Sequence, residues 1–133
     1  MEGRLPNEKA ALLAAKENCD LPILASMSFE AGGRTFTGCT IPSMARTLEG
    51  LGADAIGLNC SQGPKQLLPL FQELCRVTTL PVIAKPNAGL PDPVDGHYDL
   101  PPEEFARTMV DVVGAGVSIV GGCCGTTPAH IAA

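Results

Sequence analysis

The chain has few aromatic residues. Its 133 residues include no tryptophan, one tyrosine and four phenylalanines, while hydrophobic residues still make up 45% of the total. A core can be packed, but it has to be built mainly from alanine, leucine, valine and isoleucine. Such a core is typical of buried parallel sheets and their covering helices.

Basic residues and long apolar runs are also scarce. Nine basic against fourteen acidic residues give a formal net charge of −5, which disfavours a phosphate backbone as partner, so no nucleic-acid binding is expected. No apolar run approaches the roughly 18 residues of a membrane span, so no membrane partner is expected. The N-terminal segment lacks the apolar core of a secretory signal. We therefore expect a cytoplasmic protein whose six cysteines are thiols or metal ligands rather than a disulfide framework.

Strand and helix patterns alternate along the chain. Short apolar runs predict strands over residues 21–27, 53–60, 80–87 and 117–122. Helical spacing predicts helices over residues 7–18, 42–52, 61–78 (including an opening turn), 101–116 and 126–133. This order predicts an α/β fold, a parallel sheet of four strand-helix units with right-handed crossovers. Two architectures fit it: half of a (β/α)8 TIM barrel, which needs about 250 residues when complete, or a small open flavodoxin-like sheet.

Two adjacent cysteines stand in the stretch GGCCGTTPAHI, residues 121–131. A disulfide prefers Cα atoms roughly 4.4–6.8 Å apart, whereas chain neighbours are about 3.8 Å apart, so these two are poorly placed to bond each other. Cys123 and Cys124 follow the last predicted strand, and Cys60 ends the second one. Because the carboxyl ends of parallel strands gather on one face, the three thiols can converge on one ion.

Three thiols on one face favour a zinc site. Thiolate prefers zinc to magnesium or calcium, and three protein ligands leave the fourth tetrahedral position open, as in catalytic sites. Zinc held by thiolates is suited to binding a substrate thiol as thiolate, which indicates alkyl transfer to sulfur. Gly121, Gly122 and Gly125 would let the backbone turn so that both neighbouring sulfurs face the ion. Two other interpretations remain open, namely cysteines packed inertly in the core and a glycine-rich loop that binds phosphate.

The other cysteine, histidine and tyrosine side chains are not expected in this site. Cys75 is predicted inside a helix, facing the core. Cys19 and Cys39 fall in connections between elements. His97 and Tyr98 fall in the surface loop over residues 88–100, and His130 falls in the last helix, where it is expected to be solvated.

Three sequence blocks, in this order, resemble a known family. They are GLNCSQGP at residues 57–64, PNAGLP at 86–91 and GGCCGTTPAHI at 121–131. Together they resemble the homocysteine-binding domain of cobalamin-dependent methionine synthase, within the homocysteine S-methyltransferase family. The similarity includes ASMSFEAGGRTFTG at 25–38 and extends from about Lys9 to the end of the chain.

The resemblance implies a (β/α)8 barrel, of which residues 1–133 would be a single partial domain, the C-terminal half with strands five to eight. It implies that Cys60, Cys123 and Cys124 bind Zn²⁺. It also places Asn87 beside the metal, either in the fourth position before the substrate arrives or as a loop-capping residue.

The implied reaction forms methionine. A zinc-activated homocysteine thiolate would attack a methyl group of methylcobalamin that is charged from methyltetrahydrofolate, so cobalamin- and folate-binding domains are the expected partners. Residues that hold the amino and carboxylate groups of homocysteine are expected before Met1, and Glu2, Glu8 and Glu30 do not match their position.

Two alternatives to this reaction remain open. The methyl donor could be betaine or S-methylmethionine. The chain could also be a non-catalytic zinc-binding half-barrel that pairs with its missing half or with itself. An open sheet of four strands has two edges whose unpaired backbone groups favour pairing with another strand.

Overall fold

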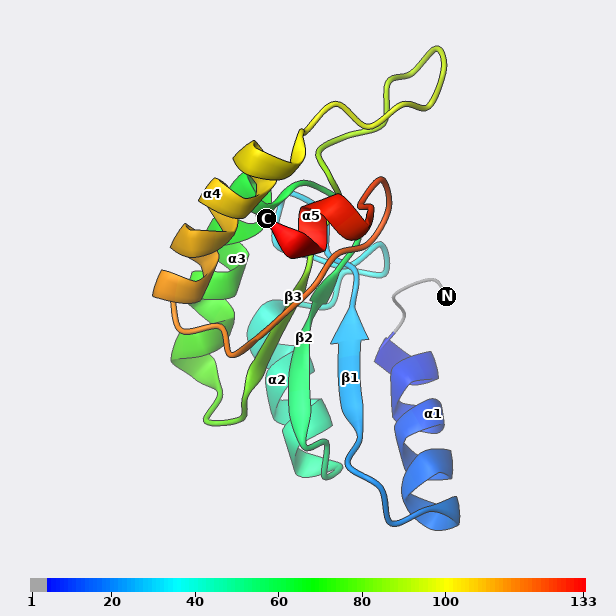
Figure 1. Cartoon of the computed structure of the whole chain (residues 1–133). Coiled ribbons are helices and arrows are strands. Elements are labelled where there is room, and N and C mark those ends of the chain that lie inside the picture. Colours follow the sequence, from blue (N-terminus) through cyan, green and yellow to red (C-terminus); the bar gives the residue numbers. More distant parts are fainter. Residues whose placement is uncertain (1–4) are drawn as a thin grey trace.

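A computed structural model describes residues 5–133 of the chain, and helices and strands alternate along it (Figure 1). The predicted elements are all present with shifts of a few residues at their ends. They are α1 (Leu5–Asn18), β1 (Leu24–Met27), α2 (Ile41–Gly50), β2 (Ala55–Asn59), α3 (Pro64–Val77), β3 (Val82–Lys85), α4 (Pro102–Gly114), β4 (Ile119–Val120) and α5 (Pro128–Ala132).

The four strands form one open, parallel sheet in the order β1-β2-β3-β4. A flavodoxin-like sheet would instead place β1 between β2 and β3. Each strand here pairs with the next strand in the chain, as consecutive strands of a barrel do. The predicted half-barrel is therefore confirmed, and the flavodoxin-like alternative does not have the observed strand order.

One hydrophobic core joins the sheet to the helices. Ile56 and Leu58 of β2 pack in the same cluster as Phe71 and Leu74 of α3 and Phe105 of α4. Most other members of the cluster are aliphatic, as the scarcity of aromatic residues predicts. The helices α1 to α4 all contribute buried side chains to this cluster, so they fix the strands from one face.

Local sequence signals set the ends of α2. The hydroxyl of Thr40 accepts a hydrogen bond from the backbone N–H of Ser43, and a proline stands in the first turn. Gly52, with φ of +86°, takes the left-handed conformation that ends the helix. The predicted cap and stop are thus confirmed. In α3, Pro69 lies inside the helix, which continues to Val77.

The two edges of the sheet are open. On the outer strand β1, Leu24 is 54% exposed, and on β4 Val120 is 53% exposed. Beside β4, an apolar groove of about 310 Å³ is lined by Phe105, Met109 and Ile131, among others from α4 and α5. Within residues 5–133, no helix has the length and apolar character needed to cross a membrane.

The ends of the strands point towards α5 and towards the loop between β3 and α4. Figure 1 shows α5 across the end of the sheet where the arrows finish, with the loop projecting away from the same end. The residues that follow β2, β3 and β4 meet here, and they form the candidate site.

Candidate metal-binding site

Cys60 follows β2 in an unusual backbone conformation. Cys60 and Ser61 have φ angles of +57° and +65°, the left-handed region that non-glycine residues rarely adopt. Such residues cost on the order of 1–3 kcal/mol each. Hydrogen bonds hold the turn, because the N–H of Cys60 donates to the carbonyl of Lys85 and the N–H of Gln62 donates to the carbonyl of Cys60. A strained turn held in this way is a common feature of functional sites.

The turn that carries Cys123 and Cys124 is tied to the preceding strand. The N–H of Gly121 donates to the carbonyl of Ala84 over 2.9 Å, and the N–H of Cys123 donates to the carbonyl of Pro86 over 2.9 Å. The hydroxyl of Thr126 donates to the carbonyl of Cys123 over 2.7 Å. The turn after β4 is thereby held beside the end of β3.

The three sulfurs converge. The Sγ atoms of Cys60 and Cys123 are 2.7 Å apart, those of Cys60 and Cys124 3.6 Å, and those of Cys123 and Cys124 4.0 Å. Within residues 5–133, these three cysteines form a group whose ligand atoms lie close enough together to hold one metal ion. Tetrahedral zinc with bonds of about 2.3 Å would separate its sulfurs by about 3.8 Å. Two of the three separations are near that value, and the Cys60–Cys123 pair would have to open by about 1 Å.

The thiols of Cys60 and Cys123 differ in how readily they ionise. Desolvation acts against the charged form of Cys60, but hydrogen bonds from the thiols of Cys123 and Cys124 and from backbone N–H groups bring the pKa of Cys60 below its usual value. Burial, the hydrogen bond to Cys60 and the charge of the neighbouring thiolates raise the pKa of Cys123 to about 11. Between these two thiols, the negative charge is therefore favoured on Cys60, and a bound cation would favour loss of the proton of Cys123 as well.

Asn87 links the connections that follow three strands. Its side chain is 4% exposed, and its Oδ1 atom accepts a hydrogen bond from the N–H of Cys124 over 3.0 Å. Its own N–H donates to the carbonyl of Gln62, and the N–H of the next residue, Ala88, donates to the carbonyl of Cys124. The Oδ1 atom of Asn87 therefore holds the turn at Cys124. This contact fits the second of the two roles that the resemblance implies for Asn87, that of a loop-capping residue.

The three glycines of the turn differ in what surrounds them. A Cβ atom at Gly122 would collide with the side chain of Thr126, and one at Gly125, where φ is +77°, would collide with the ring of Tyr98. A Cβ atom at Gly121 would meet only Lys85, at an ordinary contact distance of 3.6 Å. Steric reasons for glycine are therefore found at Gly122 and Gly125.

The cysteines that were not expected in the site lie elsewhere. Cys75 is half-buried and packs against the core, as predicted. Cys19 is exposed, and the half-buried thiol of Cys39 donates to the carbonyl of Thr40. Among the glutamates, Glu8 lies in α1 and Glu30 in the connection after β1, while Glu2 lies outside the described residues.

Two predictions about surface residues were wrong. Tyr98 is half-buried, and its ring lies against Gly125. Desolvation, a hydrogen bond with Cys124 and the charge of the thiolates raise the pKa of Tyr98. His130 is likewise half-buried; its ring meets Phe105 edge-on, and its Nε2 atom lies 2.9 Å from the carbonyl oxygen of Leu100. By contrast, His97 is exposed, as expected.

Sequence reasoning missed Tyr98 because loop residues are usually on the surface. Its position depends on how the loop after β3 returns to the turn after β4, and no local pattern encodes that contact. The one usable signal was Gly125, whose missing side chain leaves room for a ring.

Comparison with known families assigns the chain. The family model described as homocysteine S-methyltransferase matches residues 4–133. The chain belongs to the homocysteine S-methyltransferase family. This confirms the family to which the three sequence blocks pointed.

Relatives in this family include two mycobacterial proteins. The chain is 38% identical over 131 residues to a methionine synthase of Mycobacterium tuberculosis, and 36% identical over 131 residues to one of Mycobacterium leprae. Each match covers 92% of this chain and 11% of the relative. The chain therefore spans about a ninth of the length of these relatives.

Solved structures with the same fold come from the homocysteine methyltransferase MmuM of Escherichia coli. Its oxidized form superposes with a TM-score of 0.77 at 21% identity, over 98% of this chain and 41% of that one. Its metallated form gives a TM-score of 0.72 at 25% identity, over 98% of this chain and 40% of that one. The four strand-helix units thus correspond to less than half of these homocysteine methyltransferase barrels.

Proposed function

We propose that this chain carries the zinc site of a homocysteine S-methyltransferase of the methionine synthase type. The observation that carries the proposal is the convergence of three sulfurs, from Cys60, Cys123 and Cys124, at the ends of parallel strands in a member of this family. Inert packing is a poor explanation for these thiols, because Cys124 is exposed and the other two are only half-buried.

The donor set fits zinc. Three thiolates are soft ligands that zinc prefers, and a three-ligand site leaves one tetrahedral position for a substrate atom. When bound, zinc would lower the pKa of a homocysteine thiol while leaving its sulfur nucleophilic. The cysteine sulfurs would be the ligands, and Asn87 would hold the turn of Cys124 in place through its backbone N–H.

The reaction we propose is methyl transfer to sulfur. The homocysteine thiol would release its proton to solvent, and its sulfur would take the methyl group of methylcobalamin, which would keep the electron pair of the broken carbon–cobalt bond. Methionine would then be released. The cobalamin and the methyltetrahydrofolate that recharges it would lie on other domains, which is supported by the small share of the mycobacterial relatives that this chain covers.

We also propose that the protein is cytoplasmic. All six cysteines are free thiols, which suits a reducing compartment. Three of them would have to remain reduced to bind a metal.

A zinc titration tests the metal site. We expect about one zinc per purified chain, and at least a tenfold loss of affinity in each of C60S, C123S and C124S, because each variant removes one thiolate from a three-ligand site. Elemental analysis gives the stoichiometry, and competition with a coloured chelator gives the affinity. C19S is the matched control, because Cys19 is exposed and remote from the site, and it should bind zinc as the unchanged chain does. Unchanged affinity in the three site variants would contradict the proposal.

The methyl donor is a separate question. In a second candidate, betaine or S-methylmethionine replaces methylcobalamin as the donor, and the structural likeness to a protein named homocysteine methyltransferase fits either donor. Supplying the complete, zinc-loaded protein that contains this chain with homocysteine and each labelled donor in turn discriminates between them. We expect labelled methionine from methylcobalamin alone; labelled methionine from betaine or S-methylmethionine favours the second candidate, and none from any donor favours a non-catalytic half-barrel.

A further inference from the structure

Tyr98 lies where the loop between β3 and α4 returns to the body of the protein. Its backbone bridges to Pro91, and the N–H of Asp92 donates to the carbonyl of His97 over 2.7 Å. The carboxylate of Asp92 also accepts the N–H of Val94 over 2.7 Å. These contacts close the base of the loop, so the backbone of Tyr98 has a fixed position although the loop itself projects outward (Figure 1).

The side chain of Tyr98 turns inward from this base. Its neighbours His97 and Asp99 are exposed, whereas Tyr98 is half-buried. Atoms of its side chain from Cβ to Cδ1 occupy the space that a Cβ atom at Gly125 would need. The ring therefore packs on the residue that directly follows Cys124.

Because Gly125 directly follows Cys124, the ring of Tyr98 lies beside the turn that carries the Cys124 sulfur, and desolvation together with the nearby Cys124 raises the pKa of Tyr98. Cys124 is the most exposed of the three converging cysteines. Its backbone N–H is already held by Asn87. Two residues of the connection that follows β3 thus contact this turn, Asn87 at the backbone of Cys124 and Tyr98 at Gly125.

We propose that Tyr98 is a positioning residue of the thiolate site, whose ring supports the turn at Gly125 and whose hydroxyl donates a hydrogen bond to the sulfur of Cys124. This inference rests on the proposed function, because it takes the three sulfurs as ligands of one cation. The hydrogen bond withdraws electron density from the thiolate, which makes the sulfur a weaker donor and leaves more positive charge for the fourth ligand. Partners of this kind around metal ligands commonly change metal affinity by about 10- to 100-fold.

Two substitutions separate the ring from the hydroxyl. Y98F keeps the ring on Gly125 and removes the hydrogen bond, whereas Y98A removes both. Cobalt(II) is the probe, because its thiolate charge-transfer band reports how strongly the sulfurs donate. H97A is the matched control, because His97 is the adjacent loop residue and its side chain is exposed.

The expected results differ between the variants. In Y98F, cobalt binds with one ion per chain, and the charge-transfer band moves to longer wavelength, because the unbonded thiolate gives up electron density more easily. In Y98A, cobalt affinity falls by about tenfold or more. H97A should match the unchanged chain in both measurements.

Two results would overturn the inference. A band that does not move in Y98F excludes the hydrogen bond, and Y98A binding as tightly as the unchanged chain excludes support by the ring. Because Y98F preserves the packing, a folding defect in Y98A does not remove the first test. Failure of the unchanged chain to bind cobalt would contradict the proposed function, and this inference with it; bound cobalt with an unmoved band contradicts this inference alone.

Discussion

The backbone conformation and packing of the turn after β4 restrict which residues can occupy single positions in it. Gly125 combines a left-handed backbone with a ring packed where its side chain would be, and Gly122 faces Thr126 at close range. Cys60 adopts a left-handed conformation in the turn after β2. These positions set where the sulfurs point, so the constraint on the site lies in the backbone as much as in the cysteines.

The first prediction compares two glycines. G125A should lower the free energy of unfolding by about 1–3 kcal/mol, because alanine disfavours a φ of +77° and its methyl group would displace Tyr98. It should also weaken zinc binding. G121A is the matched control, because its methyl group would make only an ordinary contact with Lys85. Denaturant unfolding and chelator competition measure both effects, and equal stability of the two variants would contradict this account of the turn.

The cysteine triad could be predicted from the sequence, whereas its surroundings could not. The spacing of Cys60, Cys123 and Cys124 places each after a strand, and parallel strands bring those ends together. Tyr98 and His130 were assigned to the surface because their partners, Gly125 and Phe105, are distant in the chain. Contacts of that kind follow from tertiary packing and leave no periodic signal.

At the level of the elements, local signals and packing agree. The apolar runs became strands, and a capping threonine and a terminal glycine mark the ends of α2. The positions of the helices around the sheet also depend on contacts between elements. One of these joins α1 to the turns before β1 and β2 through Asp54.

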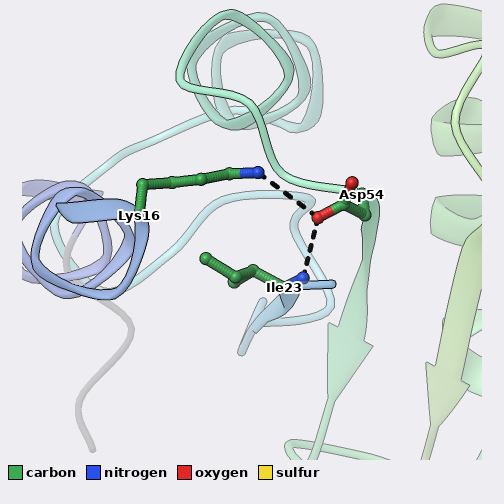
Figure 2. Close-up of polar contacts among 3 residues, drawn as sticks. All are labelled: Lys16, Ile23 and Asp54. Atoms are coloured by element: carbon green, nitrogen blue, oxygen red, sulfur yellow. Dashed lines mark hydrogen bonds and ion pairs between the residues drawn. The ribbon is translucent and has the colours of Figure 1, made fainter. Parts of the chain in front are cut away.

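Figure 2 shows the carboxylate of Asp54 between two partners. It accepts the N–H of Ile23 over 2.8 Å and lies 3.4 Å from the Nζ atom of Lys16 in α1. The hydrogen bond from Ile23, more than the nearby lysine, lowers the pKa of Asp54. The ionised carboxylate is thus favoured in the folded state.

The second prediction follows from the sign of this shift. A carboxylate whose pKa is lowered by folding stabilises the fold above its ordinary pKa of 3.8, and that stabilisation is lost as the pH falls through the lower, folded value. D54N should therefore reduce the melting temperature at pH 7, and the difference from the unchanged chain should shrink towards pH 3. E17Q, which alters an exposed carboxylate of the same helix region, serves as control. A difference that stays constant from pH 7 to pH 3 would argue against an ionic contribution of Asp54.

For the molecule as a whole, the open edges are the dominant feature. The sheet has the strand order of a barrel but not its closure, and apolar side chains of β1 and β4 remain exposed. Exposed strand edges with unpaired backbone groups favour pairing with another sheet. The MmuM chains are more than twice as long as the segment matched here. The remainder of such a chain is therefore available to pair with the open edges of the sheet.

The third prediction concerns association of the chain. We expect it to self-associate with increasing concentration through the edge of β4 and the neighbouring apolar groove. V120K places a charge at this edge and should reduce association, whereas V94K, at a loop position that is 93% exposed, should not. Sedimentation velocity across a concentration series distinguishes the cases, and a monomer at every concentration would show that the open edge needs no partner.

The central claim is that the three cysteines hold zinc and leave one position for the sulfur of homocysteine. X-ray absorption at the zinc edge tests it most directly, because the spectrum reports how many sulfur atoms surround the ion. The zinc-loaded chain should show three sulfurs and one lighter ligand, changing to four sulfurs when homocysteine is added. Fewer than three sulfurs in the loaded chain, or no fourth sulfur at saturating homocysteine, would contradict the account.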